Sequence, residues 1–100
     1  MSLPVILRRL AQTEFDDAAD WYDQRAAGRG AMFTAAVRQV MADIAVTPQM
    51  YPVVYADVRE ALVSGYPYAV YYRVDLSQVT VLAVFHTSRD PAGWQSRASP

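Results

Sequence analysis

Cysteine and lysine are both absent from this sequence, and each absence excludes a class of chemistry. Without cysteine there can be no disulfide, no thiolate zinc site and no cysteine nucleophile. All nine basic residues are arginine, so a Schiff-base lysine and the lysine of a phosphate-binding loop are excluded as well. Histidine occurs once, as His86, which is too few for a transition-metal site without cysteine. We therefore expect neither a metal nor a cofactor.

Long apolar runs are also missing. No stretch of about 18 apolar residues occurs, which predicts no membrane span. The N-terminus lacks the apolar core and the small-residue cleavage site of a signal peptide, so we expect a cytoplasmic protein that does not bind membranes. With 53% hydrophobic residues, a chain of 100 residues can form one two-layer core. We predict a single domain over residues 1–100.

Two dense runs of β-branched and aromatic residues dominate the second half of the chain. They are Tyr68–Val74 and residues 79–85, and both are of strand length. The polar residues 75–78 between them predict a hairpin, and the Gly and Pro of residues 64–67 predict a preceding turn. This pattern therefore predicts a three-stranded meander over residues 57–86.

Loop lengths alone predict the register of this meander. Arg59 falls opposite Tyr72, and Val70 falls opposite Ala83, and opposed side chains share a face. One predicted face is almost wholly apolar and should bury against helices: Arg59, Ala61, Val63, Tyr68, Val70, Tyr72, Val79, Val81, Ala83 and Phe85. The opposite face mixes polar and apolar groups, and we expect functional residues there: Val58, Glu60, Leu62, Ala69, Tyr71, Arg73, Thr80, Leu82, Val84 and His86.

The first half of the chain predicts a short strand followed by two helices. Residues 5–10 are strand-like, and Thr13 is a predicted N-cap for a first helix that runs to about Ala27. Glycines at 28 and 30 end it, and a second helix follows from about Ala31 to Val46. The predicted fold is α+β with the order β-α-α-β-β-β, in which a helical hairpin packs on one face of an antiparallel sheet.

Three segments of this chain resemble a known family. They are residues 57–59 (Asp-Val-Arg), 66–74 (Tyr-Pro-Tyr-Ala-Val-Tyr-Tyr-Arg-Val) and 81–91, followed by Trp94 and Arg97. With the order of elements, they resemble the RelE/ParE superfamily of bacterial toxins. These are the toxin halves of type II toxin–antitoxin modules and are often labelled plasmid stabilisation proteins. The resemblance implies a RelE/ParE-like fold and a growth-inhibiting toxin that forms a hetero-oligomer with a cognate antitoxin.

Within this superfamily the resemblance implies one of two mechanisms. RelE-like members are ribosome-dependent endoribonucleases that cut messenger RNA with polar side chains on the open sheet face, whereas ParE-like members poison DNA gyrase by binding. Cleavage needs a group that takes the 2′-OH proton and cations near the phosphate. The candidates in this chain are His86, Arg73, Glu60, Tyr71 and Arg89.

The predicted register does not bring these candidates together. His86 falls beside Pro67 and Arg73 beside the turn at Asp75, about 20 Å apart at ~3.3 Å per residue, too far to share one phosphate. A sequence pI of about 5.6 without lysine also disfavours a surface that binds ribosomal RNA. We therefore predict a ParE-like toxin that binds DNA gyrase and favour binding over enzymatic activity.

Two alternatives remain open: a RelE-type endoribonuclease that acts on the ribosome through His86 and Arg89, and a non-toxic interaction module with the same fold. For contact with the target or the antitoxin we predict Arg59, Tyr71, Arg73, Trp94 and Arg97. Structural roles compete with this prediction, because Arg59 can stack on Tyr72 and Trp94 with Arg97 can close one end of the sheet. The first predicted helix carries five of the ten acidic residues, so its acidic face is a candidate contact for antitoxin arginine or lysine.

Overall fold

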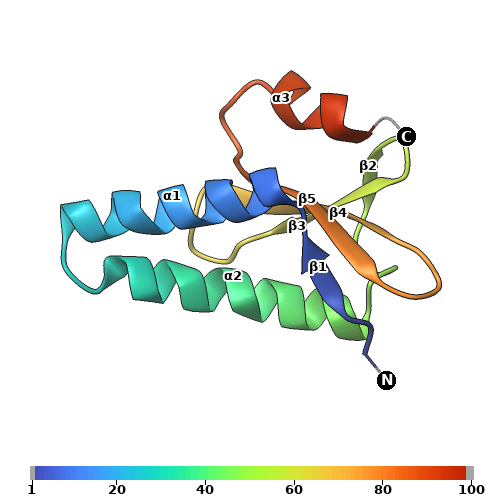
Figure 1. Cartoon of the computed structure of the whole chain (residues 1–100), viewed down its shortest axis with the longest axis horizontal. Helices are drawn as coiled ribbons and strands as arrows, with labels where there is room; N and C mark the ends of the chain where they lie inside the picture. The colour runs from blue at the N-terminus through green and yellow to red at the C-terminus, as the bar shows by residue number, and fades with distance from the viewer. Residues whose placement is uncertain (1, 99–100) are drawn as a thin grey trace.

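A computed structural model of the chain describes residues 2–98 as a helical hairpin, a five-stranded sheet and a short C-terminal helical segment (Figure 1). In chain order the elements are β1 (Val5–Leu7), α1 (Arg9–Arg25), α2 (Arg29–Val46), β2 (Val53–Tyr55), β3 (Val58–Leu62), β4 (Tyr68–Val74), β5 (Val79–His86), α3 (Ala92–Gln95) and a 3-10 turn (Ser96–Ala98). Within the described residues, no helix is both long enough and apolar enough to cross a membrane.

The strands are ordered β1-β5-β4-β3-β2 across the sheet. β2 to β5 form an antiparallel meander, as predicted for β3 to β5, whereas β1 lies parallel to β5 with Val5 opposite Val79. The sheet is therefore mixed rather than wholly antiparallel. β2 is a further strand that the predicted three-stranded meander did not include. The predicted α+β fold, with a helical hairpin on one face of the sheet, is confirmed.

The first helix begins earlier than predicted. α1 starts at Arg9, so Thr13 lies inside the helix and its predicted role as N-cap is wrong. The backbone N–H of Arg8 donates to the Val81 carbonyl of β5, which leads the chain directly from β1 into the helix. Ala11 is fully buried in the core, so tertiary packing outweighs the capping preference of Thr13.

The core between the helices and the sheet combines aliphatic and aromatic side chains. Phe15 on α1 and Phe33 on α2 meet edge to face, with ring centroids 6.1 Å apart. Further helical and strand residues complete this cluster: Ala11, Ala18, Val37, Val40, Ile44, Ala61, Val63, Val70, Tyr72, Val79, Val81 and Val84. This cluster joins both helices to one face of the sheet.

A β-bulge in β5 changes the predicted faces. Tyr72 pairs with Val81 as predicted, but Tyr71 pairs with Ala83, so Leu82 is an extra residue. Beyond it every pairing shifts by one, and Val70 lies opposite Val84 instead of Ala83. The predicted faces are therefore wrong for the last part of β5: Val84 and His86 join the helix face, and Ala83 and Phe85 move to the other face.

The second face of the sheet is covered by the C-terminal segment, which lies on the side away from α2 (Figure 1). Buried side chains form a second apolar cluster there: Val58, Ala69, Tyr71, Leu82, Ala83, Phe85, Trp94 and Ala98. The sequence predicted an open face of mixed polarity. That prediction is wrong because the bulge supplies two further apolar residues and Trp94 packs over them.

The close approach of α2 to α1 requires glycine at position 30, in the first turn of α2. The Gly30 N–H donates to the Asp23 carboxylate at 2.7 Å, and a Cβ at Gly30 would lie 2.6 Å from the Ala19 carbonyl oxygen. We expect Gly30→Ala to lower the free energy of unfolding by about 1–3 kcal/mol, because helix backbone must move. Urea denaturation measures this, with the exposed neighbour Ala31→Ser as control. Equal midpoints for the two variants would contradict the prediction.

The segment between α2 and β2 is held by two side chains of the sheet. The hydroxyl of Tyr72 donates to the Pro48 carbonyl, and the Arg59 guanidinium donates to the Tyr51 carbonyl at 2.6 Å and the Gln49 carbonyl at 3.2 Å. Burial raises the pKa of Tyr72 to about 12, although the Arg59 charge acts in the opposite direction.

This pKa predicts a specific loss of stability in alkali. The unfolded chain loses the Tyr72 proton near pH ~10, two units before the folded chain does, so the folded state binds more protons between these values. The stabilisation is complete below pH ~10 and is lost as the pH rises to about 12. We expect Tyr72→Phe to cost about 1 kcal/mol at neutral pH and to lessen this decline. Urea titrations from pH 7 to 12 measure it, and parallel curves for both proteins would contradict it.

Candidate functional site

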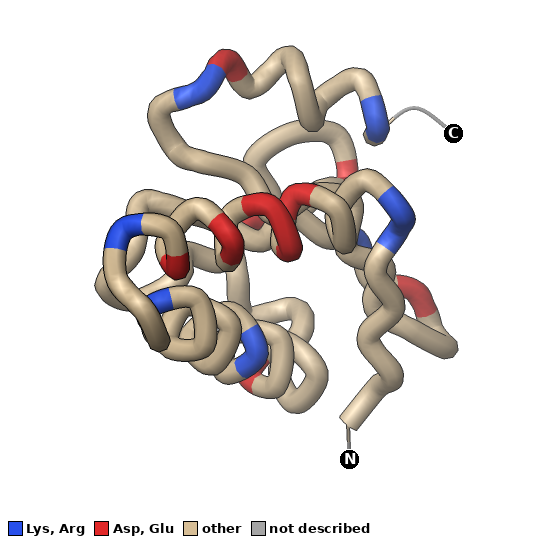
Figure 2. The backbone as a smooth tube through the Cα atoms, turned by 60° about the vertical axis from the view of Figure 1, so that its left-hand side comes forward, with Lys and Arg blue, Asp and Glu red and all other residues tan. Residues whose placement is uncertain are grey.

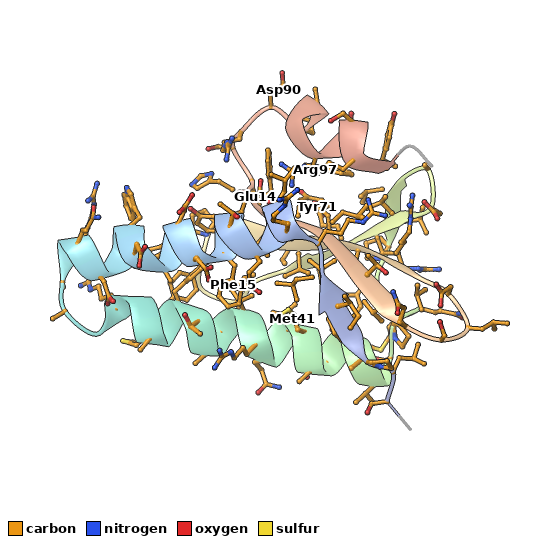
Figure 3. The ribbon with its side chains drawn as sticks, in the orientation of Figure 1. Glu14, Phe15, Met41, Tyr71, Asp90 and Arg97 are labelled. Atoms are coloured by element: carbon orange, nitrogen blue, oxygen red, sulfur yellow. The ribbon has the colours of Figure 1, made fainter. Side chains whose placement is uncertain are left out.

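The C-terminal segment is attached to α1 through an ion pair between Glu14 and Arg97. The two guanidinium nitrogens each lie 2.9 Å from a different carboxylate oxygen, a bidentate geometry. The exposed fractions of the two side chains are only 16% and 18%. Figure 3 shows them side by side between α1 and the C-terminal segment. No local sequence pattern indicates this pair, because 83 positions separate its members.

The same pair completes the hydrogen bonding of β5 at the bulge. β1 pairs with β5 only as far as Val81, so the next backbone groups on that edge lack a strand partner. Glu14 accepts the Val84 N–H at 3.2 Å, and Arg97 donates to the Leu82 carbonyl at 3.1 Å. Both members of the pair therefore substitute for a missing strand.

Trp94 is buried against the second sheet face. Its ring stacks on Tyr71 with centroids 4.0 Å apart and planes 15° apart, and 3% of its surface is exposed. The Tyr71 hydroxyl donates to Glu60 at 2.7 Å. Burial, followed by this hydrogen bond to a carboxylate, raises the pKa of Tyr71 well above its ordinary range. Tyr71 therefore stays neutral at physiological pH and acts as a packing platform.

The two remaining arginines of the predicted contact set also have partners within the chain. Arg73 donates to Asp57 at 2.8 Å and to the Ala98 carbonyl at 2.6 Å, and Arg59 holds the segment before β2 as described above. Structural contacts therefore engage all five residues predicted to bind the target or the antitoxin. Their role in binding a partner stays a prediction.

His86 and Arg73, which were predicted to share a face, lie on opposite faces of the sheet. His86 pairs with Tyr68 and turns toward the helices, whereas Arg73 lies five residues further along β4 and faces the C-terminal segment. Five residues of strand span about 17 Å at ~3.4 Å each. The predicted separation along the sheet therefore stands, and the bulge adds a change of face.

His86 lies near Arg89 at the end of β5. Its Nδ1 accepts the Ser88 backbone N–H at 3.1 Å and lies 2.8 Å from the Ser88 hydroxyl. The Arg89 guanidinium lies 4.5 Å from the centroid of the Phe85 ring. Among residues 2–98, no group of three or more His, Asp or Glu side chains is arranged to hold a metal ion.

These two residues line a hollow between α1 and the end of the sheet, which we call the α1 hollow. Its volume is about 440 Å³, a size typical of ligand pockets. Its polar and aromatic lining comes from Glu14, Asp17, Trp21, Tyr22, Tyr68, His86 and Arg89. The sequence did not predict this hollow, because the bulge is what turns His86 toward α1.

Comparisons with known proteins agree with this fold. The family profile described as the ParE toxin of the type II toxin–antitoxin system parDE matches residues 5–91. The chain therefore belongs to the ParE toxin family of type II toxin–antitoxin systems.

A solved structure, described as the chromosomal ParDE toxin–antitoxin system from P. aeruginosa, has a chain of similar fold. It superposes with a TM-score of 0.65 at 16% identity, over 87% of this chain and 98% of that one. At this identity the likeness shows the fold alone. No curated protein gives a significant sequence match.

Two ion pairs that differ in exposure, Glu14–Arg97 and Asp57–Arg73, provide a matched test of how the C-terminal segment is held. Arg97→Met leaves the Glu14 carboxylate partly buried without its cation and the Leu82 carbonyl unpaired, so we expect a loss of about 2–4 kcal/mol in unfolding free energy. Asp57 is 65% exposed, so Asp57→Asn should cost less than about 1 kcal/mol. Urea denaturation measures both. Similar losses of unfolding free energy for Arg97→Met and Asp57→Asn would contradict the prediction that the Glu14–Arg97 pair is the one that holds the C-terminal segment.

Proposed function

We propose that this ParE-family chain is a toxin that acts by binding DNA gyrase and is neutralised by a cognate antitoxin. It does so in the cytoplasm, and toxin and antitoxin form a hetero-oligomer. Membership of the ParE family supports the toxin role. One observation carries the choice of mechanism: the side chains that a nuclease would need lie on different faces of the sheet, and several are engaged in structural contacts.

In-line cleavage of RNA requires a base and a cation at the same phosphate. Arg73 is on the face opposite His86 and is held by Asp57 and the Ala98 carbonyl. A backbone N–H can only donate, so the Nδ1 of His86 is an acceptor toward Ser88 and the proton of the neutral ring is on Nε2. The other ring nitrogen, Nε2, is thus a donor in this tautomer, and a nitrogen that carries a proton cannot accept one from the 2′-OH.

The antitoxin part of the proposal is supported by apolar side chains left exposed. The exposed fractions are 47% for Trp21, 65% for Met32 and 56% for Leu10, all on the helical hairpin. Antitoxin segments that bind as helices or extended chains gain affinity by covering such side chains. The solved relative also comes from a ParDE toxin–antitoxin system.

A ribosome-dependent endoribonuclease is the second candidate function. Its supporting observation is that His86 and Arg89 line the same hollow, beside the aromatic rings of Tyr68 and Trp21. Only one arginine accompanies the histidine there.

Removing both residues separates the two mechanisms. We expect the double variant His86→Ala/Arg89→Ala to inhibit growth within about twofold of wild type when the chain is expressed alone, because binding of gyrase does not use an acid–base pair. The matched control is Arg38→Ala on the exposed side of α2. DNA-damage signalling and transcript integrity are measured in the same cultures, and thermal unfolding of each purified variant confirms that it is folded.

The endoribonuclease mechanism predicts the opposite result for the double variant. A folded double variant that no longer inhibits growth, together with cleaved transcripts and no DNA-damage response in the wild type, would reject the proposed mechanism. A wild-type chain that does not inhibit growth at all would reject the toxin role and favour a non-toxic interaction module.

A further inference from the structure

The α1 hollow has two walls of different charge. One wall is α1, where Glu14, Asp17 and Trp21 follow one another at helical spacing on one side of the helix. The other wall is the end of the sheet and the chain after it, where Tyr68, His86 and Arg89 lie. Acidic residues recur along α1 as a run of red bands in Figure 2. The hollow thus lies beside the most acidic element of the chain.

The acidic wall contains one carboxylate that forms no ion pair within the described residues. Glu14 is occupied by Arg97 and by the Val84 N–H. Asp17, in contrast, is exposed and has no ion pair or hydrogen bond to any side chain among residues 2–98. A ligand in the hollow would therefore meet a carboxylate that is free to bind a cation.

The aromatic side chains of the hollow also favour a cation. Tyr22 and Tyr68 line it with Trp21, and the faces of such rings carry negative electrostatic potential. Trp21 already binds a cation within the chain, since the Arg25 guanidinium lies 3.8 Å from its ring centroid. Aromatic rings beside a carboxylate form an environment suited to an arginine or lysine side chain, whose apolar stem packs on the rings.

We propose that the α1 hollow binds an arginine or lysine side chain of the antitoxin, with Asp17 as its ion-pair partner and Tyr22 and Tyr68 as its walls. The inference rests on the proposed neutralisation by an antitoxin and assigns one of its contacts. An apolar residue of the same antitoxin segment would cover the exposed part of Trp21.

Arg89 allows an experiment to distinguish a cationic ligand of the hollow from an anionic one. Arg89 lines the hollow and its guanidinium lies over the Phe85 ring, so its charge repels a bound cation and attracts an anion. A cationic ligand therefore depends on Asp17 and gains from the loss of Arg89. An anionic ligand has the reverse dependence.

Blocked tripeptides test the hollow without the antitoxin. Acetyl-Leu-Arg-Leu-amide is titrated into the ¹⁵N-labelled full chain and compared with the same peptide carrying citrulline, which is isosteric and neutral, or glutamate. We expect only the arginine peptide to give saturable NMR shifts at the Trp21 indole N–H and the His86 amide, with a dissociation constant on the order of 1 mM. Asp17→Asn should weaken its binding at least about fivefold, and Arg89→Gln should leave it unchanged or tighter.

The matched control is Asp20→Asn, which removes a carboxylate of the same helix that does not line the hollow. It should change the affinity less than about twofold, since a solvated charge outside the site is screened. Equal effects of Asp17→Asn and Asp20→Asn would overturn the proposal, as would equal binding of the citrulline peptide or no saturable shifts. Binding of the glutamate peptide that is lost in Arg89→Gln would overturn it in favour of an anion.

A second measurement connects the hollow to the antitoxin. The product of a neighbouring gene of antitoxin type is titrated against wild type, Asp17→Asn and Asp20→Asn, and we expect about tenfold weaker binding for Asp17→Asn alone. An antitoxin that binds all three equally would reject the assignment of the contact. If no neighbouring antitoxin binds the chain, the proposed function fails, whereas the peptide titration still decides whether the hollow accepts a cation.

Discussion

The bidentate pair of Glu14 and Arg97 is the interaction on which the rest of this structure depends. β1 is only three residues long, so β5 has an open edge from Leu82 onward, and the bulge at that point leaves further backbone groups without a strand partner. The Glu14 carboxylate accepts the Val84 N–H, and the Arg97 guanidinium donates to the Leu82 carbonyl. The two side chains also bond to each other. One ion pair thereby completes the sheet edge, holds α1 against β5 and fixes the C-terminal segment.

This arrangement determines which surfaces the toxin offers to a partner. Trp94 and Ala98 close the second face of the sheet, and Arg73 and Tyr71 are held within it by Asp57, Glu60 and the Ala98 carbonyl. The sheet face that would carry nuclease residues is thus largely a second core. Exposed apolar and aromatic side chains lie on the helical hairpin, beside the α1 hollow, and along β2 at the edge of the sheet. Such a distribution suits a protein that works by binding.

The sequence predicted those parts of the fold that depend on local pattern. Chain turns and strand lengths were enough to place Arg59 opposite Tyr72 and to predict a helical hairpin before the meander. The bulge at Leu82 was missed because nothing in an apolar run marks an extra residue, and one such residue exchanges the faces of His86 and Phe85. The Glu14–Arg97 pair and the α1 hollow were missed because tertiary packing creates them.

The proposed mechanism is that this chain inhibits its target by binding it and does not cleave RNA. The most direct test compares two reconstituted reactions with the purified wild-type chain: DNA gyrase with relaxed plasmid, and ribosomes translating a defined messenger RNA. We expect dose-dependent inhibition of supercoiling, or accumulation of gyrase-linked DNA breaks, and intact messenger RNA. Cleavage of the messenger RNA on the ribosome, with gyrase activity unchanged, would contradict it.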